Sequence, residues 1–409
     1  MDALSSLRTD APSRVVGLMS GTSLDGVDAV VATVEGHGSA LSVTQEAFTH
    51  TPYPEALREQ IHEAATNAAS VRDVARLHVR LAHAYADAVD AVLAEAGQTR
   101  DALDLVGCHG QTVQHLPEPS DCAGEPVRSS LQLGNPSTLA TKLGVPVVGD
   151  FRAADLALSG QGAPLVPYFD YACFTDPDEP RGLLNLGGIA NLTVLPAATD
   201  RDAVRAFDTG PGNMVLDALA RRLFDAPMDR NGRRAAQGTP DHDLLADLLS
   251  LDYFHRPPPK STGRADFGPD FVDDLLGAAQ SRGLSPEDTM ATATLLTAGS
   301  VYQAYARYIR PDRREEVVSG PRPEQSIERV IVSGGGVHND TLMDMLADAF
   351  APIPVESIAE HGVAPDAKEA LCFAVLAHET VHGVPTSLPS VTGAERAAVL
   401  GSVSVPTGA

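Results

Sequence analysis

The chain contains the stretch Gly17-Leu-Met-Ser-Gly-Thr-Ser-Leu-Asp-Gly-Val-Asp28, a glycine-broken turn between two valine-rich apolar runs at 15–19 and 27–34. Short apolar runs on both sides of a glycine-containing turn predict two antiparallel strands joined by a tight hairpin. Glycine permits positive φ and turns backbone N–H groups outward, and the hydroxyls of Thr22 and Ser23 add donors. The turn therefore predicts an anion-binding loop for phosphates, with a plain surface hairpin as the alternative.

Asp25 would lie beside a phosphate bound by this loop. Two negative groups repel each other unless a cation lies between them, and carboxylate and phosphate oxygens are the ligands that Mg²⁺ prefers. The loop therefore also predicts a magnesium ion near Asp25.

Length and charge limit the classes of protein that this chain represents. It has 409 residues with 43% hydrophobic content, more than a single core usually holds, so we expect two domains. The net charge is −24, from 54 acidic and 30 basic residues without a basic block, which argues against nucleic acid and anionic membranes as partners. No signal pattern and no apolar run approaching about 18 residues is present, so we expect a cytoplasmic protein.

Polar residues follow an apolar strand in Leu103-Asp-Leu-Val-Gly-Cys-His-Gly-Gln-Thr112, after two helices expected within 55–96. Polar loops at strand ends carry ligand contacts in α/β sheets, so His109 and Gln111 are candidates to hydrogen-bond a polar ligand. For His109, a histidine satisfied within the protein is the alternative. We expect the proline-rich segment 118–128 to be a surface loop.

Arg152 follows a second apolar run, 145–149. Its planar guanidinium donates two parallel hydrogen bonds, which favours a role as a clamp for a substrate carboxylate. An ion pair with Asp150 or Asp155 is the alternative.

The second half of the chain repeats the pattern of the first. Gly182-Leu-Leu-Asn-Leu-Gly-Gly-Ile-Ala-Asn-Leu-Thr-Val194 predicts another hairpin, and a cleft between two such domains would hold a nucleotide from both sides. Val330-Ile-Val-Ser-Gly-Gly-Gly-Val-His-Asn339 predicts a parallel strand, an open turn suited to adenine or ribose, and a helix. This layout resembles the sugar-kinase, Hsp70 and actin superfamily, and the Walker pattern is absent.

Asp208 stands before a glycine turn in Ala206-Phe-Asp-Thr-Gly-Pro-Gly-Asn213, and a helix is expected at 214–223. A carboxylate placed there can face a cleft while the helix N-terminus offers backbone donors, so Asp208 is the predicted general base. A helix cap is the alternative, but Asn213 is better placed to cap this helix. Two polar loops follow, 229–232 and 257–264, and the second would be a lid with cationic ends or a stiff connector.

Further motifs occur in order along nearly the whole chain, from about residue 14 to the tail Thr392-Gly-Ala394. They are Gly17 to Asp28 as quoted, Gly110-Gln-Thr112, Gly134-Asn-Pro136, Asp150-Phe-Arg152, Gly160-Gln-Gly-Ala-Pro-Leu-Val-Pro167, Asn185-Leu-Gly-Gly188, Phe207-Asp-Thr-Gly-Pro-Gly-Asn213, Lys260-Ser-Thr-Gly-Arg264 and Gly334-Gly-Gly336. With this set the chain resembles the anhydro-N-acetylmuramic acid kinase family. The resemblance implies a two-domain actin-like ATPase, of ribonuclease H-like α/β fold, with the nucleotide cleft between its lobes. We place the first lobe at 14–153 plus helix 367–383 and the second at 154–366.

The resemblance implies a function in peptidoglycan recycling. It implies that ATP and water convert 1,6-anhydro-N-acetylmuramic acid into N-acetylmuramate 6-phosphate, with Asp208 as the base that activates the water. A levoglucosan-type anhydro-sugar kinase and a non-catalytic sugar or nucleotide sensor are the alternatives. A homodimer is implied by the resemblance alone.

The residues expected to bind ligands divide into two groups. ATP and Mg²⁺ would be bound by Gly21, Thr22, Ser23, Leu24, Asp25, Gly26, Val27, Asp28, Gly187, Gly188, Gly334, Gly335 and Gly336, with Asp25 acting indirectly on the metal. The sugar would be bound by His109, Gln111, Arg152, Gly210 and Asn213.

The chain departs from the family pattern at two positions. Ser159 stands where glycine is common, and Ala265 stands where glutamate is usual. The neighbouring Asp266 is a candidate to replace that glutamate.

A competing motif, His378-Glu-Thr-Val-His382, matches the H-E-x-x-H pattern of zinc proteases. A catalytic zinc needs three protein ligands, and Glu395 is the one acidic residue that follows the motif. We therefore interpret the two histidines as the solvent-exposed end of a helix.

Overall fold

The computed structural model describes residues 7–406 except 10, 198–199 and 311–325, and the chain forms two compact units. The first unit contains 1–173 and 362–409, and the second contains 174–361. From the sequence we expect the first boundary between the lobes at 153/154. In the structure, helix α4 (Ala153–Ala157) and all but the last residue of helix α5 (Val166–Phe174) belong to the first unit.

The first unit is built on one mixed sheet, whose described strands run in the order β12-β6-β4-β1-β2-β3, with β5 paired to β4. The strands are β1 (Ser13–Ser20), β2 (Gly26–Glu35), β3 (Ser42–Pro52), β4 (Leu105–Cys122), β5 (Glu125–Leu133), β6 (Val147–Gly149) and β12 (Ser402–Ser404). β1, β2 and β3 are antiparallel neighbours, whereas β1, β4 and β6 are parallel. The predicted hairpin is confirmed, with Met19 opposite Asp28.

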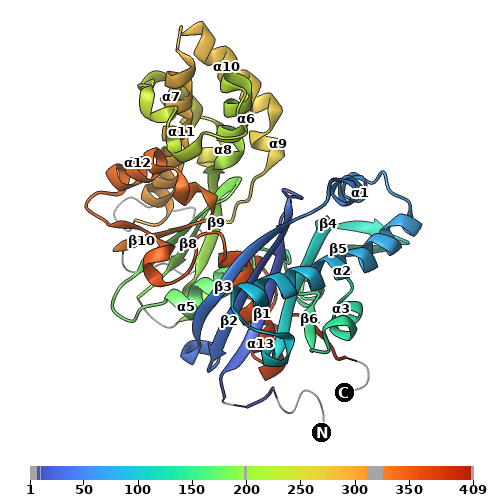
Figure 1. Ribbon diagram of the computed structural model, residues 1–409. Coiled ribbons are helices and arrows are strands. Elements are labelled where there is room, and N and C mark those ends of the chain that lie inside the picture. The colour runs from blue at the N-terminus through green and yellow to red at the C-terminus, as the bar shows by residue number, and fades with distance from the viewer. Residues whose placement is uncertain (1–6, 10, 198–199, 311–325, 407–409) are drawn as a thin grey trace. The chain divides into compact units, whose positions relative to one another are not determined.

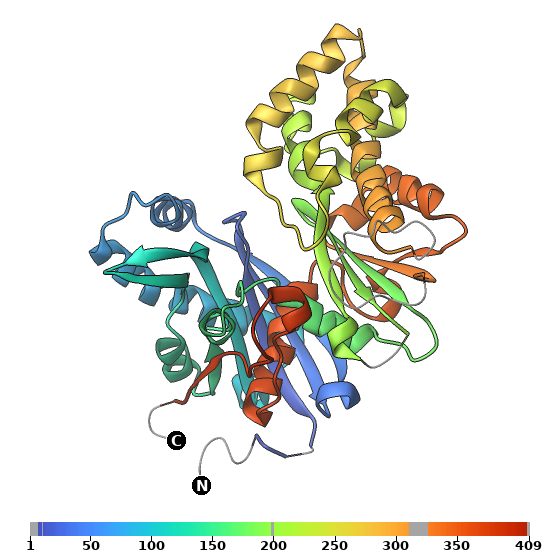
Figure 2. The same ribbon diagram turned by 180° about the vertical axis from the view of Figure 1, so that it is seen from behind.

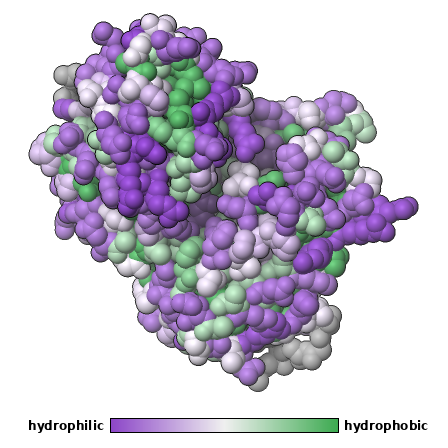
Figure 3. All heavy atoms as spheres, turned by 45° about the horizontal axis from the view of Figure 1, so that its top comes forward, coloured by the Kyte–Doolittle hydropathy of each residue, from purple (hydrophilic) through white to green (hydrophobic). Residues whose placement is uncertain are grey.

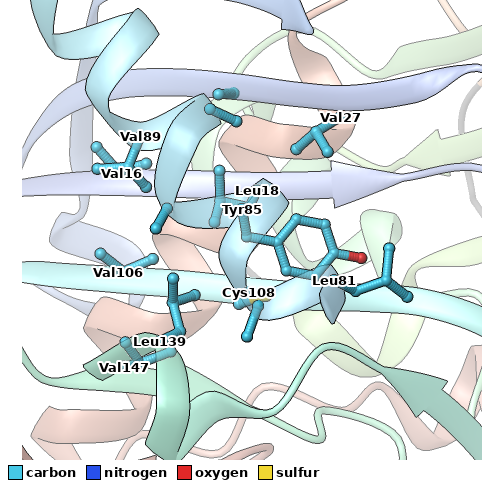
Figure 4. Close-up of a cluster of buried hydrophobic side chains, with 14 of the residues drawn as sticks. Val16, Leu18, Val27, Leu81, Tyr85, Val89, Val106, Cys108, Leu139 and Val147 are labelled. Carbon is cyan, nitrogen blue, oxygen red and sulfur yellow. The ribbon is translucent and has the colours of Figure 1, made fainter. Parts of the chain in front are cut away.

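Helices cover both faces of this sheet (Figure 2). Besides α4 and α5, the described α-helices of the unit are α1 (Glu55–Ala65), α2 (Val71–Glu95), α3 (Pro136–Leu143), α13 (Lys368–His382) and α14 (Pro389–Thr392). α2 begins where the Ser70 hydroxyl accepts a hydrogen bond from the Asp73 N–H, and it buries apolar residues at helical spacing. Figure 4 shows its Tyr85 beside Leu18 and Cys108 in the core between α2 and the sheet.

β4 is longer than the sequence predicts. The expected surface loop at 118–128 is wrong, because β4 continues to Cys122 and returns as β5 from Glu125. Ala123 and Gly124 form the two-residue turn, both with positive φ (57° and 92°), as the turns of tight hairpins require. The signal was weak because alanine stands where asparagine or aspartate usually does.

α13 packs directly on the backbone of β1 and β4 at two glycines. A Cβ atom on Gly17 would lie 1.9 Å from the carbonyl oxygen of Ala370, and one on Gly107 would lie 2.0 Å from that of Phe373. Any side chain at either position would push the helix off the sheet, so glycine is required by close approach.

The second unit holds a second mixed sheet, with its described strands in the order β11-β10-β7-β8-β9. The strands are β7 (Arg181–Leu186), β8 (Ile189–Leu195), β9 (Arg205–Pro211), β10 (Arg329–Ser333) and β11 (Val355–Ser357). The helices are α6 (Asn213–Phe224), α7 (His242–Leu249), α8 (Asp252–His255), α9 (Arg264–Phe267), α10 (Pro269–Ser281), α11 (Pro286–Tyr308) and α12 (Asp340–Phe350), with the 3₁₀ turn η7 (Gly335–His338). The predicted hairpin at 182–194 and the parallel strand before the triple glycine are both confirmed.

The two sheets share one topology. In each, the first strand pairs with an antiparallel second strand, which pairs in turn with an antiparallel third. On its other side the first strand pairs with a parallel strand, which pairs in turn with another parallel strand. The predicted ribonuclease H-like α/β class is therefore confirmed for both units. The face of the molecule in Figure 3 is mainly hydrophilic, in keeping with the net charge of −24. Among the described residues, no helix is both long and apolar enough to cross a membrane.

We predict that Gly17→Ala destabilises the protein by about 1–3 kcal/mol, because the new methyl group overlaps the α13 backbone. The measurement is the free energy of unfolding in urea. Gly277→Ala in α10 is the matched control: its Cβ meets no atom within 4 Å, and alanine is the better helix former. Equal stabilities for the two variants would contradict close packing at Gly17.

Candidate active site

The hairpin between β1 and β2 forms a loop that is held at both ends. Gly21 accepts a hydrogen bond from the Gln111 side-chain amide at 3.0 Å, and the Asp25 carbonyl accepts one from the Tyr53 N–H at 3.0 Å. Leu24 has φ 59°, a left-handed conformation that is strained for a residue with a side chain. Thr22 and Ser23 are exposed at the tip, where a ligand can reach them.

Two side chains with oxygen atoms able to bind a metal ion or its waters lie together on this loop. The Ser23 hydroxyl donates to the Asp25 carboxylate at 2.7 Å, and both side chains are exposed. The described residues contain no group of three or more His, Cys, Asp or Glu side chains able to hold a metal. Mg²⁺ usually keeps several waters and takes one or two carboxylates plus phosphates, so this loop fits Mg²⁺ and does not fit a metal enclosed by protein ligands.

Asp28 lies on β2, three residues after Asp25, and is half-buried. Burial raises the pKa of its carboxyl, and the hydrogen bond from His50 at 2.8 Å opposes that rise. Gly26 is fully packed, because a Cβ there would lie 2.4 Å from the Thr51 carbonyl oxygen.

His109 and Gln111 are part of β4 and not of a loop after it, because the pairing with β5 extends the strand. His109 is buried, and its Nε2 accepts hydrogen bonds from Arg152 Nη2 at 2.8 Å and Nε at 3.2 Å. Its ring packs on Phe373 of α13, with 4.6 Å between the ring centres. Burial and the Arg152 charge both hold the pKa of His109 well below its usual value, so the ring is neutral.

Arg152 forms neither of the ion pairs weighed from the sequence. Its Nη1 donates to the Gly162 carbonyl at 2.6 Å, while Asp155 accepts from the Gly162 N–H at 2.8 Å. Burial lowers the pKa of Arg152 to about 10, so it stays charged at neutral pH. Its hydrogen bonds go to neutral groups, and the nearby Glu369 carboxylate favours its charged form.

Ser159 has φ 66°, which explains why glycine is common at this position. Its hydroxyl donates to Glu395 at 3.0 Å. Glu395, the possible third zinc ligand, is thus engaged in a local contact.

Asp208 lies on β9, and the segment after α8 wraps against it. The Asp208 N–H donates to the Lys260 carbonyl at 3.1 Å, and the Thr262 N–H donates to its carboxylate at 2.8 Å. The Tyr253 hydroxyl donates to the Asp208 carbonyl at 2.8 Å. Burial raises the pKa of Asp208 to about 6, and the Thr262 N–H and the Lys260 charge limit the rise.

Lys260 stands beside this carboxylate. Burial lowers the pKa of its ammonium group to about 8, and its Nζ lies 4.5 Å from the centre of the Tyr253 ring. The segment 257–264 therefore carries backbone and charge contacts to Asp208, which the alternatives of a lid or a connector did not include.

The Gly187–Gly188 turn packs against the start of α6. The N–H groups of Asn213 and Met214 donate to the Gly187 and Gly188 carbonyls, at 2.8 and 3.1 Å. The expected cap is wrong: Gly212 caps the helix, and the Asn213 side chain donates instead to the Leu186 carbonyl at 3.1 Å. These first donors of α6 are therefore already used inside the protein.

Gly210 is buried, and a Cβ there would lie 2.7 Å from the Ser300 hydroxyl oxygen and 2.9 Å from the Phe254 ring. Packing alone explains glycine at this position, and its contact with a sugar stays a prediction.

The triple glycine begins at Gly334, which has φ 82°, and continues into η7. A cavity of about 470 Å³ opens beside it. Gly335 and Asn213 both line this cavity, which brings a predicted nucleotide residue and a predicted sugar residue together. The remaining lining residues, none of which was predicted as a ligand contact, are Leu216, Asp217, Met228, Asp229, Arg230, Asn231, His338 and Asn339.

Besides Asn213 and the glycine turn at 334–336, the polar composition of 229–232 was a sequence signal for this cavity. Asp217 gave no such signal, because it lies inside an amphipathic helix. Burial raises its pKa to about 6.

The interpretation of the H-E-x-x-H motif as an exposed helix end is wrong, because α13 is covered along nearly its whole length. His378 is 2% exposed, and its Nε2 lies 2.9 Å from the Gly36 carbonyl oxygen. Because a carbonyl oxygen only accepts hydrogen bonds, His378 Nε2 is the donor. Glu379 accepts from the Gly38 N–H and the Tyr168 hydroxyl, at 2.7 and 2.9 Å. Both side chains thus make hydrogen bonds to protein groups, while His378 Nδ1 and Glu379 Oε2 are buried without a partner. The described residues contain no group of three His, Cys, Asp or Glu side chains able to hold a metal here.

Comparisons with known proteins agree along the whole chain. The family model described as anhydro-N-acetylmuramic acid kinase matches residues 13–406. A protein of that name from Salinibacter ruber is 69% identical over 407 residues, covering 99% of this chain and 100% of the relative. One from Caldanaerobacter subterraneus subsp. tengcongensis is 38% identical over 408 residues, covering 99% and 100%.

Matches among solved structures are more distant. One is component A of (R)-2-hydroxyglutaryl-CoA dehydratase from Acidaminococcus fermentans, with a TM-score of 0.46, 11% identity, and coverage of 90% of this chain and 99% of that one. Another is a ROK family glucokinase from Streptomyces griseus, with a TM-score of 0.37, 12% identity, and coverage of 90% and 100%.

Two units of ribonuclease H-like topology with glycine turns at their strand ends define a protein of the actin-like ATPase fold class. The chain belongs to the anhydro-N-acetylmuramic acid kinase family. The family resemblance found in the sequence motifs is thereby confirmed, and with it the prediction of an anhydro-sugar kinase.

We predict that Arg152→Met raises the pKa of His109, because the variant removes a neighbouring positive charge while the ring stays buried. Ring ¹⁵N NMR across a pH titration measures this pKa. His78, whose pKa is lowered by burial alone, is the internal control and keeps its value. A His109 pKa unchanged by the substitution would show that Arg152 does not act on the ring.

Proposed function

We propose that this chain opens 1,6-anhydro-N-acetylmuramic acid with water and phosphorylates it with ATP in a single reaction. A water oxygen bonds to the anomeric carbon, the bond from that carbon to the bridging oxygen breaks, and the freed oxygen takes the γ-phosphoryl group. The products are N-acetylmuramate 6-phosphate, ADP and one proton. The observation that carries this proposal is the half-buried Asp208, held by donors beside a lysine, in a chain of this family.

Asp208 would accept the proton of the attacking water. A base works best when its pKa is close to the working pH, and burial brings that of Asp208 to about 6. The Thr262 N–H holds one carboxylate oxygen, Oδ2. The other oxygen is left to face the water. Because the departing bridge oxygen is captured by phosphorus, the reaction needs no second carboxylic acid to protonate it.

Two features have the chemistry to contact ATP. The exposed tip residues Thr22 and Ser23 would contact phosphate oxygens, with the Ser23 hydroxyl turning away from Asp25, and Asp25 would hold Mg²⁺ through its waters. Mg²⁺ supplies neutralisation of phosphate charge during phosphoryl transfer. The cavity beside Gly335 suits a nucleoside, since it combines an open glycine backbone with apolar and polar walls.

The lactyl carboxylate of the sugar is the proposed partner of Arg152. His109 would hold the guanidinium in place through Nε2, and the remaining N–H groups would reach the carboxylate. In this proposal His109 acts through Arg152, because its Nδ1 is enclosed by protein. We also retain the expectations of a homodimer and of a cytoplasmic location, where ATP is available.

The discriminating experiment incubates the protein with ATP, Mg²⁺ and either anhydro-N-acetylmuramic acid or levoglucosan, and follows ADP release. Turnover with the first sugar and not with the second supports the proposal. Turnover with levoglucosan alone would point to the other kinase, and binding without ADP release would point to a sensor.

We predict that Asp208→Asn lowers kcat by at least about 10²-fold while the Kd for ATP stays within about twofold, because the variant removes the base and leaves the nucleotide contacts. Steady-state kinetics and calorimetric titration of ATP measure the two quantities. Near-normal turnover in Asp208→Asn would place the base elsewhere.

We predict that kcat rises with pH through about 6 and then levels off, because Asp208 acts as a base once its raised pKa has been passed. The measurement is the pH dependence of kcat. Asp217 has a similarly raised pKa, so Asp217→Asn is the control: it changes the KM for ATP and retains the acid limb of kcat. Loss of the acid limb of kcat in Asp217→Asn would show that the limb reports Asp217 and not Asp208.

A further inference from the structure

Asp208 is joined to a second carboxylate through one intervening residue. The backbone N–H of Thr262 donates to Asp208 Oδ2 at 2.8 Å, and the hydroxyl of Thr262 donates to Asp266 Oδ2 at 2.7 Å. Thr262 therefore directs its backbone donor at one carboxylate and its side-chain donor at the other. The orientation of the Thr262 N–H toward Asp208 therefore depends on the hydrogen bond that the Thr262 hydroxyl makes to Asp266.

Asp266 is a firm anchor because its helix, α9, is pinned to the core. The next residue, Phe267, is 1% exposed and packs its ring 5.2 Å from Tyr253, 5.7 Å from Phe254 and 5.1 Å from Phe271, measured between ring centres. Figure 1 shows α9 and α8 in the same helical part of the second unit. An aromatic cluster thus fixes the helix backbone from which the Asp266 side chain extends.

The same cluster holds the other side of Asp208. Tyr253, which packs on Phe267, donates its hydroxyl to the Asp208 carbonyl at 2.8 Å. Lys260, the residue whose carbonyl accepts from the Asp208 N–H, also places its ammonium group over the Tyr253 ring. The backbone and the carboxylate of Asp208 are therefore fixed with respect to one set of aromatic rings.

We propose that Asp266 is a positioning residue for the reaction: through Thr262 it fixes the N–H group that aims the Asp208 carboxylate at the attacking water. This inference rests on the proposed function, in which Asp208 is the base. It also accounts for Ala265, which is exposed where glutamate is usual, since the carboxylate comes from the next position.

The electrostatic consequence has a definite sign. A hydrogen bond donated to a carboxylate favours its ionised form, so the Thr262 N–H lowers the pKa of Asp208 against the effect of burial. The charged and titratable groups around this carboxylate are Lys260 and Tyr253, with Arg256 lying 3.9 Å from Asp266. Weakening the Thr262 contact leaves burial and Lys260 unchanged, so the pKa of Asp208 rises.

The test compares Asp266→Ala and Thr262→Val, which remove the two ends of the hydroxyl contact, with the conservative Thr262→Ser. We expect both disruptive variants to lose about 10- to 100-fold in kcat, to keep the KM for ATP, and to shift the acid limb of kcat upward by about one pH unit. Thr262→Ser keeps the hydroxyl and stays close to the unmodified protein. Asp274→Ala, which removes an exposed carboxylate from α10, is the charge control and leaves all three quantities unchanged.

A second readout does not depend on turnover. Carboxyl ¹³C NMR of aspartate-labelled protein gives the pKa of Asp208, whose signal is assigned by its absence in Asp208→Asn. We expect this pKa to rise in Asp266→Ala and in Thr262→Val and to stay constant in Asp274→Ala. Thermal unfolding confirms that each variant is folded, and Thr262→Val replaces Asp266→Ala if the latter fails to fold.

The outcomes separate this inference from the proposed function. An unchanged pKa of Asp208 together with an unchanged acid limb in both disruptive variants would overturn the positioning role. Full turnover in Asp208→Asn would overturn the role of Asp208 as the base in the proposed function, and the NMR titration would still report whether Asp266 controls that carboxylate.

Discussion

The contact between α13 and the backbone of β1 and β4 is the constraint on which the first unit depends. A helix approaches a sheet this closely only where strand residues lack a Cβ, and Gly17 and Gly107 provide that space. The contact places Phe373 against both His109 and Phe151, with ring centres 4.6 and 5.3 Å apart. The geometry around Arg152 thus follows from two missing side chains on the neighbouring strands.

Burial is the second common feature of the polar groups in both units. It makes protonation of His109 unfavourable and brings the pKa of Asp208 into the range of a useful base. In α13 the unfavourable burial of a charge is offset by an opposite charge. Lys368 forms a 2.7 Å ion pair with Asp170, and both side chains are almost fully buried. Removing one member of such a pair leaves an uncompensated charge, so α13 is tied to α5 by charge as well as by packing.

Local sequence signals predicted the elements whose formation depends on neighbours in the chain. Both glycine hairpins, the helices within 55–96 and the strand before Gly334 follow from apolar periodicity and turn residues. The hairpin at 123–124 was missed because its turn uses alanine in a left-handed conformation. The His378 motif was misjudged because a helix pattern does not reveal whether both of its faces are covered.

The sequence by itself determined the family, the α/β class, the glycine loops and the choice of Asp208 as the candidate base, because these depend on residue identity and short spacing. Tertiary structure alone decided which groups surround those residues: Arg152 on His109, Gln111 on Gly21, and Thr262 between Asp208 and Asp266. These partners come from separate elements, and no local pattern encodes a contact that forms only when the chain has packed. The pKa values follow the same division, since burial and neighbouring charge are properties of the folded chain.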